Sequence, residues 1–149
     1  MTQTLNTTAP IRTTTAHGGA RIVGGYDDTS GPGPELLTAR TLTGNEVFNR
    51  TGDKLGVVDE IMLDVQSGRI AYAVLASGKF LGLGGKLFAI PWSSLELDAD
   101  RKCFVMDASK ERFEDAPGFD KDRWPSYASD SQWHRDVHAH YGASKHFWD

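Results

Sequence analysis

Two histidines near the carboxyl terminus, His134 and His138, have the spacing that most suggests chemistry. Four residues apart on a helix they share one face, and imidazole pairs suit zinc or nickel. Arg135 follows His134, so the HExxH pattern of zinc proteases is absent. We favour interfacial or solvated histidines, whose protonation near neutral pH could alter contacts, and metal binding by the pair stays open.

Three further patterns also have a structural interpretation. Of the carboxylates Asp59, Glu60 and Asp64 on one predicted strand, only the last two share a face, and no calcium-type loop surrounds them. Residues 82–86, Gly-Leu-Gly-Gly-Lys, lack the P-loop spacing and precede no helix, which favours a bend between strands. Cys103, the single cysteine, lies in an apolar run typical of a buried inert thiol. These patterns predict no catalytic residue, no cofactor and no enzyme.

The elements that carry these residues between 36 and 106 are short β-rich runs separated by turns. Residues 54–65 alternate with a period of two, and Ser67-Gly68-Arg69 turns the chain into the return strand 70–76. Five or six short strands without an intervening helix predict a mainly β fold, a small antiparallel barrel. The predicted core comprises Val57, Ile61, Leu63, Tyr72 or Ala73, Val74 or Leu75, and Ile90.

Four segments match a known family in order and spacing: residues 52–64, 67–74, 80–86 and 89–92. Together they resemble the PRC-barrel family, which is named for the cytoplasmic domain of the photosynthetic reaction centre H subunit. The family also includes the C-terminal domain of a ribosome maturation factor and many small stand-alone bacterial proteins. The resemblance implies a compact β-barrel with a binding or assembly role. An adaptor in RNA metabolism or ribosome maturation is the alternative, and a metal- or ligand-dependent enzyme is less favoured.

The two ends of the chain differ in character from this central domain. Residues 1–35 are rich in Thr, Gly, Ala and Pro with isolated apolar residues, which predicts a disordered tail and linker. Residues 107–149 predict a C-terminal arm, with a short helix at 110–114 and an extended stretch at 119–125. A second helix is expected from Asp130 or Ser131 to about Tyr141, where Gly142 provides a stop.

The C-terminal arm carries an unusual share of the large aromatic residues. Left in water, they would form an apolar patch larger than soluble monomers usually expose. We therefore expect the arm to pack on a barrel in a homo-oligomer, with a dimer favoured, and folding back onto its own barrel is the alternative. The predicted interface consists of Phe119, Trp124, Tyr127, Trp133, Val137, Tyr141, Phe147 and Trp148.

Charge and hydropathy narrow the classes of partner. The net charge is −4, and residues 36–106 hold eight basic and eight acidic side chains, so we do not expect a nucleic-acid-binding surface. No stretch approaches 18 consecutive apolar residues, so no transmembrane helix is expected. The first residues lack the apolar core of a secretory signal, and the expected location is the cytoplasm.

Overall fold

The computed structural model describes residues 19–25, 34–77 and 86–143, and most of its regular structure is β-strand. In chain order the elements are β1 (Arg21–Val23), α1 (Ala39–Leu42), β2 (Glu46–Asn49), β3 (Lys54–Asp64), β4 (Arg69–Ala76), β5 (Lys86–Pro91), the 3-10 helix η1 (Trp92–Ser94), β6 (Leu95–Asp98), β7 (Cys103–Met106), α2 (Lys110–Glu114), β8 (Gly118–Asp120) and α3 (Ser131–His140).

Within these residues, eight strands form one sheet in the order β1-β6-β7-β2-β3-β4-β5-β8. The prediction of a mainly β fold is confirmed. Five neighbouring pairs are antiparallel, as expected, whereas β1 runs parallel to β6 and β2 runs parallel to β7, and the predicted antiparallel barrel stays a prediction. Hydrogen bonds do not close the sheet, and β1 and β8 are its two edges.

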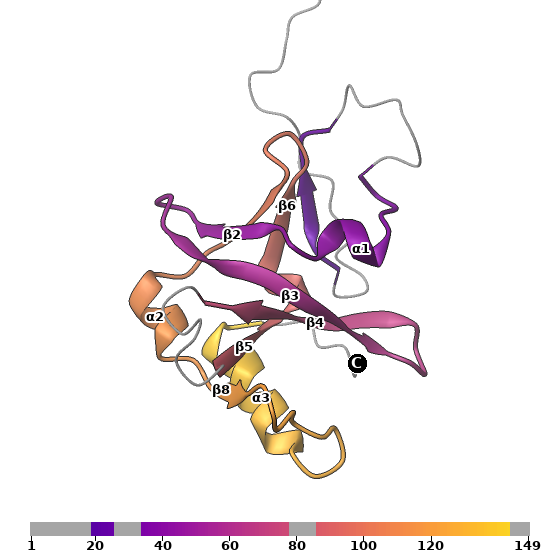
Figure 1. Ribbon diagram of the computed structural model, residues 1–149, viewed down its shortest axis with the longest axis vertical. Helices are drawn as coiled ribbons and strands as arrows, with labels where there is room; N and C mark the ends of the chain where they lie inside the picture. The colour runs from indigo at the N-terminus through magenta and orange to yellow at the C-terminus, as the bar shows by residue number, and fades with distance from the viewer. Residues whose placement is uncertain (1–18, 26–33, 78–85, 144–149) are drawn as a thin grey trace, which may run out of the picture.

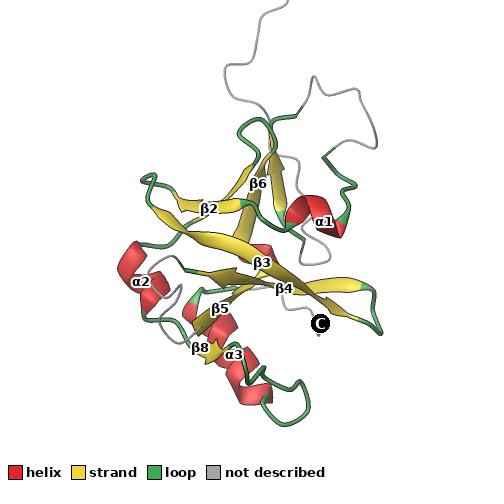
Figure 2. Ribbon diagram, viewed as in Figure 1, coloured by secondary structure: helices red, strands yellow, loops and turns green. Residues whose placement is uncertain are grey.

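The sheet curls around a single main core, so that β6 crosses β3 and β4 at a steep angle (Figures 1 and 2). Every strand from β2 to β7 contributes a buried apolar side chain to this core, and α2 adds Phe113. Several strands contribute alternate residues, which is the period expected when one face of a strand points inward. Such pairs include Ala73 and Leu75, Phe88 and Ile90, and Phe104 and Met106.

The predicted inward face of β3 is wrong at Val57 and Leu63, whereas Ile61 is half-buried and packs against the main core. Leu63 is 59% exposed and Val57 is only half-buried, whereas Val58 is 1% exposed and belongs to the main core. The pairing of β3 with β4 shifts between Val58 and Glu60 and again after Met62. Each bulge changes which residues face inward, so one alternation cannot describe the whole strand.

The four apolar residues on β4 left ambiguous by the sequence are all buried. Ala73 and Leu75 lie in the main core, and Tyr72 and Val74 lie in a second cluster on the opposite face of the sheet. Because β4 is covered on both sides, its sequence is almost continuously apolar rather than alternating. Ile90 is fully buried, as predicted.

The N-terminal region contains an element that its composition does not reveal. Residues 21–23 form β1, which differs from the expectation that residues 1–35 have no regular structure. The expectations for residues 1–18 and 26–33 lie outside the described residues. None of the helices described is long and apolar enough to cross a bilayer.

Candidate functional site

The C-terminal helix α3 begins and ends where the sequence predicts. Before it, Ser126 and Asp130 close a loop, because the Ser126 N–H donates to the Asp130 carboxylate at 2.7 Å and the Asp130 N–H donates to the Ser126 carbonyl at 2.9 Å. The helix starts at Ser131, and Gly142 follows its last turn with a φ of +63°, a conformation that favours glycine. These local signals set the length of α3.

One face of α3 covers the outer side of the chain's own sheet, below β5 and β4 in Figure 2. Val137 is 2% exposed at the centre of this contact, and the Trp133 ring meets the edge of the Tyr72 ring with 6.2 Å between centroids. This packing explains why the outward face of β4 is apolar. The sheet residues that form this second cluster are Ala71, Tyr72, Val74, Leu87, Ala89 and Phe119.

The predicted interface residues divide into three groups. The chain itself covers Phe119 and Val137 fully and Trp133 and Tyr141 in part. Trp124 and Tyr127 remain exposed, at 37% and 61%. Phe147 and Trp148 lie outside the described residues. The arm therefore packs on its own barrel through the first group, and the predicted homo-oligomer stays a prediction.

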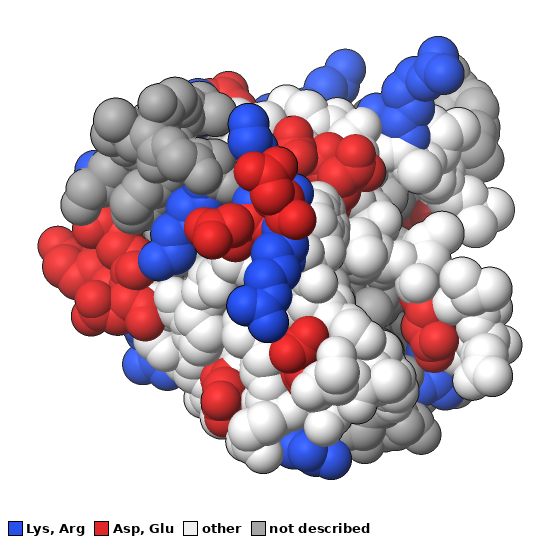
Figure 3. Space-filling view, turned by 60° about the horizontal axis from the view of Figure 1, so that its bottom comes forward, with Lys and Arg blue, Asp and Glu red and all other residues white. Residues whose placement is uncertain are grey.

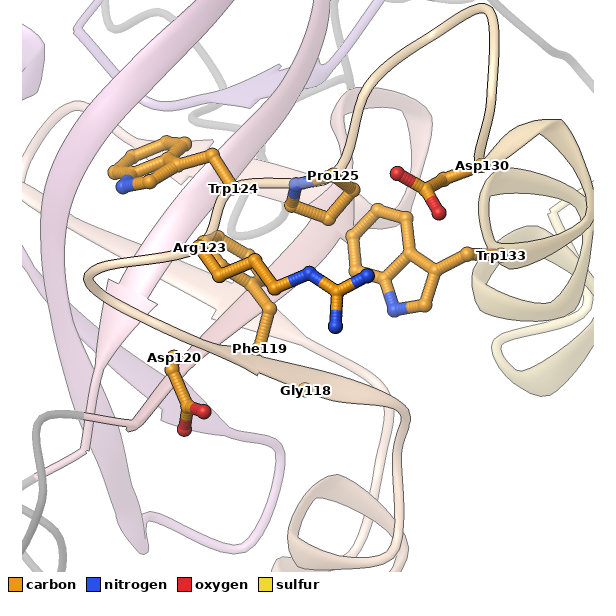
Figure 4. Close-up of a pocket in the computed structure, with 8 residues that line it drawn as sticks. All are labelled: Gly118, Phe119, Asp120, Arg123, Trp124, Pro125, Asp130 and Trp133. Carbon is orange, nitrogen blue, oxygen red and sulfur yellow. The ribbon is translucent and has the colours of Figure 1, made fainter.

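A groove of about 300 Å³ lies where β8, the following loop and the start of α3 meet. Figure 4 shows its lining, with Trp124 and Pro125 on the loop and Trp133 on α3. The Phe119 ring centroid lies 5.0 Å from that of Trp124 and 5.6 Å from that of Trp133, so three aromatic rings form a continuous wall. The full lining is Gly118, Phe119, Asp120, Arg123, Trp124, Pro125, Asp130 and Trp133.

Two hydrogen bonds fix the conformation of the loop that lines the groove. The Arg123 N–H donates to the Asp120 carbonyl at 2.9 Å, which closes the turn after β8. The Trp124 indole N–H donates to the Lys121 carbonyl at 2.9 Å and orients that ring. The side chain of Arg123 is exposed and forms no ion pair or hydrogen bond with the rest of the described chain. Its guanidinium donors are available to a ligand.

Acidic and basic side chains are interspersed on the face of the molecule drawn in Figure 3. Figure 3 shows Lys and Arg next to Asp and Glu on one face, without a continuous basic band among the residues drawn in colour. At the groove itself, Arg123 is accompanied by Asp120 and Asp130. A surface that binds the phosphate backbone of a nucleic acid needs clustered Lys and Arg side chains, and the mixed charges on this face do not provide such a cluster.

His134 and His138 are buried against the sheet, at 4% and 3% exposure, so the solvated interpretation is wrong. Nδ1 of His138 lies 2.9 Å from the His134 carbonyl. Burial lowers the pKa of His134 below its usual 6.5, and Asp130 and a hydrogen bond to the Ser126 backbone oppose this shift. Among the described residues no group of three His, Cys, Asp or Glu is placed to hold a metal ion.

Two tyrosines in the same contact are held in the neutral form. Burial raises the pKa of Tyr72 to about 12. Burial also raises the pKa of Tyr141 far above its ordinary value of 10.0, although Arg112 partly opposes the shift. Neutral phenols suit the apolar contact between α3 and the sheet.

Five residues that line the groove were not predicted from the sequence: Gly118, Asp120, Arg123, Pro125 and Asp130. The signal was present in residues 119–125, where four charged residues lie between Phe119 and Trp124. Aromatic residues interleaved with charges suggest a binding surface, whereas the aromatic residues alone suggest only a buried contact.

The remaining sequence patterns have structural positions. Cys103 is buried at 4% exposure, as predicted, and burial raises the pKa of its thiol. Asp59 and Glu60 are exposed, and the Ser67 hydroxyl donates to Asp64 at 2.6 Å in the β3–β4 hairpin. The predicted bend at residues 82–85 lies outside the described residues.

The curled sheet, its single main core and the covering C-terminal arm define a small, mainly β domain. The PRC-barrel domain model matches residues 34–113, more than half of the chain, and the chain therefore belongs to the PRC-barrel family. The match ends before β8, so the groove is built from residues beyond it. Comparison with curated proteins gives no significant match.

Proposed function

We propose that this protein is a non-catalytic protein-binding module, and that its groove binds an extended segment of a partner protein. The observation that carries the proposal is the aromatic wall of Phe119, Trp124 and Trp133 beside the uncommitted guanidinium of Arg123. The membership in the PRC-barrel family is consistent with such a role.

A peptide fits the groove better than a compact cofactor. The groove has a volume of about 300 Å³, which is at the lower end of the range of about 300–1,000 Å³ for small-ligand pockets. Aromatic rings and Pro125 offer flat apolar surface of the kind that binds proline and aliphatic side chains of extended peptides. Arg123 can donate to a backbone carbonyl or to a carboxylate of the same segment.

The test is affinity capture from native cells, with the membrane fraction included, using the full chain as bait. Trp124→Ala removes one aromatic wall, and Arg123→Glu reverses the charge beside it. Arg135→Glu is the matched control, because Arg135 is an exposed arginine on α3 that does not line the groove. Circular dichroism establishes that all three variants are folded.

We expect a specific partner that the wild type and Arg135→Glu retain and that both groove variants lose. A synthetic peptide from that partner should then quench the tryptophan fluorescence of the wild type. If the groove variants retain the same partner as the wild type, the groove is not the binding surface. If no partner distinguishes the wild type from the Trp124→Ala variant, the proposed function fails.

A further inference from the structure

The edge strand β1 is joined to the sheet only through β6 among the described strands. It runs parallel to β6, with Arg21 opposite Glu96 and Ile22 opposite Leu97. A strand at a sheet edge presents unpaired backbone groups, so another strand can pair with it. Here residues 21–25 fill that position at the outer edge of β6, far along the sheet from the groove (Figure 1).

The first residue of this segment is recognised by charge. Arg21 lies 2.9 Å from the Glu96 carboxylate, and the Arg50 guanidinium donates to both oxygens of the same carboxylate, at 3.1 and 3.3 Å. The Glu96 side chain is only 9% exposed. Arg50 holds the carboxylate in place, so the Glu96 carboxylate is positioned for a second cation from the segment.

The next residues are recognised by an apolar contact and by the backbone. Ile22 packs against the main core. The Val23 carbonyl accepts a hydrogen bond from the Ala99 N–H at 2.8 Å, and the Gly25 N–H donates to the Asp100 carboxylate at 2.9 Å. All three residues of β1 are half-buried, and Ile22 is the one that packs against the main core.

The last two positions favour glycine. Gly24 and Gly25 have φ values of +79° and +73°, which strain any L side chain. A Cβ at Gly24 would lie 2.4 Å from an Asp100 carboxylate oxygen, and a Cβ at Gly25 would lie 2.8 Å from the Cβ of Ala99. The contacts at the edge of β6 therefore favour arginine at the first position of the segment, an aliphatic residue at the second, and glycine at the fourth and fifth.

We propose that the edge of β6 is a strand-acceptor site for such a segment, and that two copies of this chain exchange residues 21–25 through it. A second copy necessarily carries the one sequence that the site is seen to bind. Exchange forms the same contacts as the intrachain arrangement, and exchange of an identical element is a low-cost route to a dimer. Residues 24–38 separate β1 from α1, so a long stretch of chain connects β1 to the rest of the sheet.

The test converts the Arg21–Glu96 ion pair into a covalent link. In the full-length Arg21→Lys variant, a zero-length carbodiimide can join the introduced amine to the Glu96 carboxylate. Equal amounts of ¹⁴N- and ¹⁵N-labelled chains are mixed at increasing concentration, cross-linked and analysed by mass spectrometry. The Lys54–Glu46 pair, at 2.9 Å between β2 and β3, is the internal control for a link within one chain.

We expect cross-links between positions 21 and 96 that join unlike isotopes, in a share that rises with concentration, while the 54–46 link joins like isotopes only. Links between like isotopes alone at every concentration would overturn the exchange. A second experiment, in the Arg21→Lys variant, tests the requirement for glycine. Gly24→Ala with Gly25→Ala should abolish the 21–96 link, and Gly44→Ala with Gly52→Ala should retain it.

The two glycine pairs are matched in backbone strain, because Gly44 and Gly52 also have positive φ values but have open space around them. Equal cross-linking in both pairs would overturn the selection for glycine. Circular dichroism of each variant separates loss of the link from loss of the fold. The site is independent of the groove, so its failure leaves the proposed function untouched.

Discussion

Arg112 on α2 and His140 on α3 each hydrogen-bond to the backbone of the other. The Arg112 guanidinium donates to the His140 carbonyl, and the His140 ring nitrogen Nε2 lies 2.7 Å from the Arg112 carbonyl. The two residues are 28 positions apart, and the pair ties the end of α3 to α2. Because α2 places Phe113 in the main core, this contact links the covering arm to the barrel.

Arg112→Ala should therefore loosen the last turn of α3. The loss of hydrogen bonds from a charged donor costs about 1.5–3 kcal/mol for buried bonds, and less here because the contact is exposed. Amide hydrogen exchange in residues 137–141 measures the effect directly. Arg135→Ala is the control, since Arg135 is exposed on the same helix. Equal exchange rates in the two variants would contradict the anchoring role.

The burial of His134 predicts a loss of stability in acid. Its pKa in the folded protein is below 6.5, so the unfolded chain binds more protons once the pH falls below about 6.5. The contribution of the neutral ring is present above that pH and is lost as the pH falls toward the folded-state pKa. Thermal melts between pH 7.5 and pH 5 should show this decline, and His134→Gln should reduce it.

The titration of His134 can also be followed by NMR of its ring protons. An apparent pKa at or above the ordinary value of 6.5 would contradict the effect of burial. The charge of the Asp130 carboxylate is the largest influence that raises the pKa of His134. Asp130→Asn should lower the measured pKa further, because it removes the charge that favours the imidazolium form.

Two leucines on β3 provide a matched test of the inward face. Leu55 is 3% exposed in the main core, and Leu63 is 59% exposed near the hairpin. Leu55→Ala should cost about 2–5 kcal/mol in the free energy of unfolding, because it removes buried apolar surface and leaves a cavity. Leu63→Ala should change that free energy by about 0.5 kcal/mol or less. Urea denaturation measures the free energy of unfolding of both variants. Similar losses in the two would support the inward face predicted from alternation.

The homo-oligomer predicted from the arm now depends on the aromatic residues that the chain leaves exposed. Trp124 and Tyr127 are the described members of that group. Light scattering of the full chain at tens of micromolar should give the mass of a dimer, and Trp124→Ser with Tyr127→Ser should lower the average mass below that of the wild type. A monomeric wild type at that concentration contradicts the prediction.

Local sequence signals determined the turns, the helix bounds and the family of this protein. The hairpin at residues 67–69 and the bounds of α2 and α3 follow from turn and capping residues within a few positions of each element. The family could be recognised because its motifs occupy consecutive short segments, and the burial of Cys103 follows from the apolar run around it. Each of these features depends on neighbours in the chain, which the sequence displays directly.

Tertiary contacts decided the rest. The bulges that turn Val58 inward and Leu63 outward arise from the pairing of β3 with β4. The burial of both faces of β4 depends on α3, which lies about 60 residues further along the chain. The position of β1 depends on an edge that β6 provides, and β6 lies more than 70 residues away. Such contacts depend on three-dimensional complementarity between distant segments, so local alternation and composition could not reveal them.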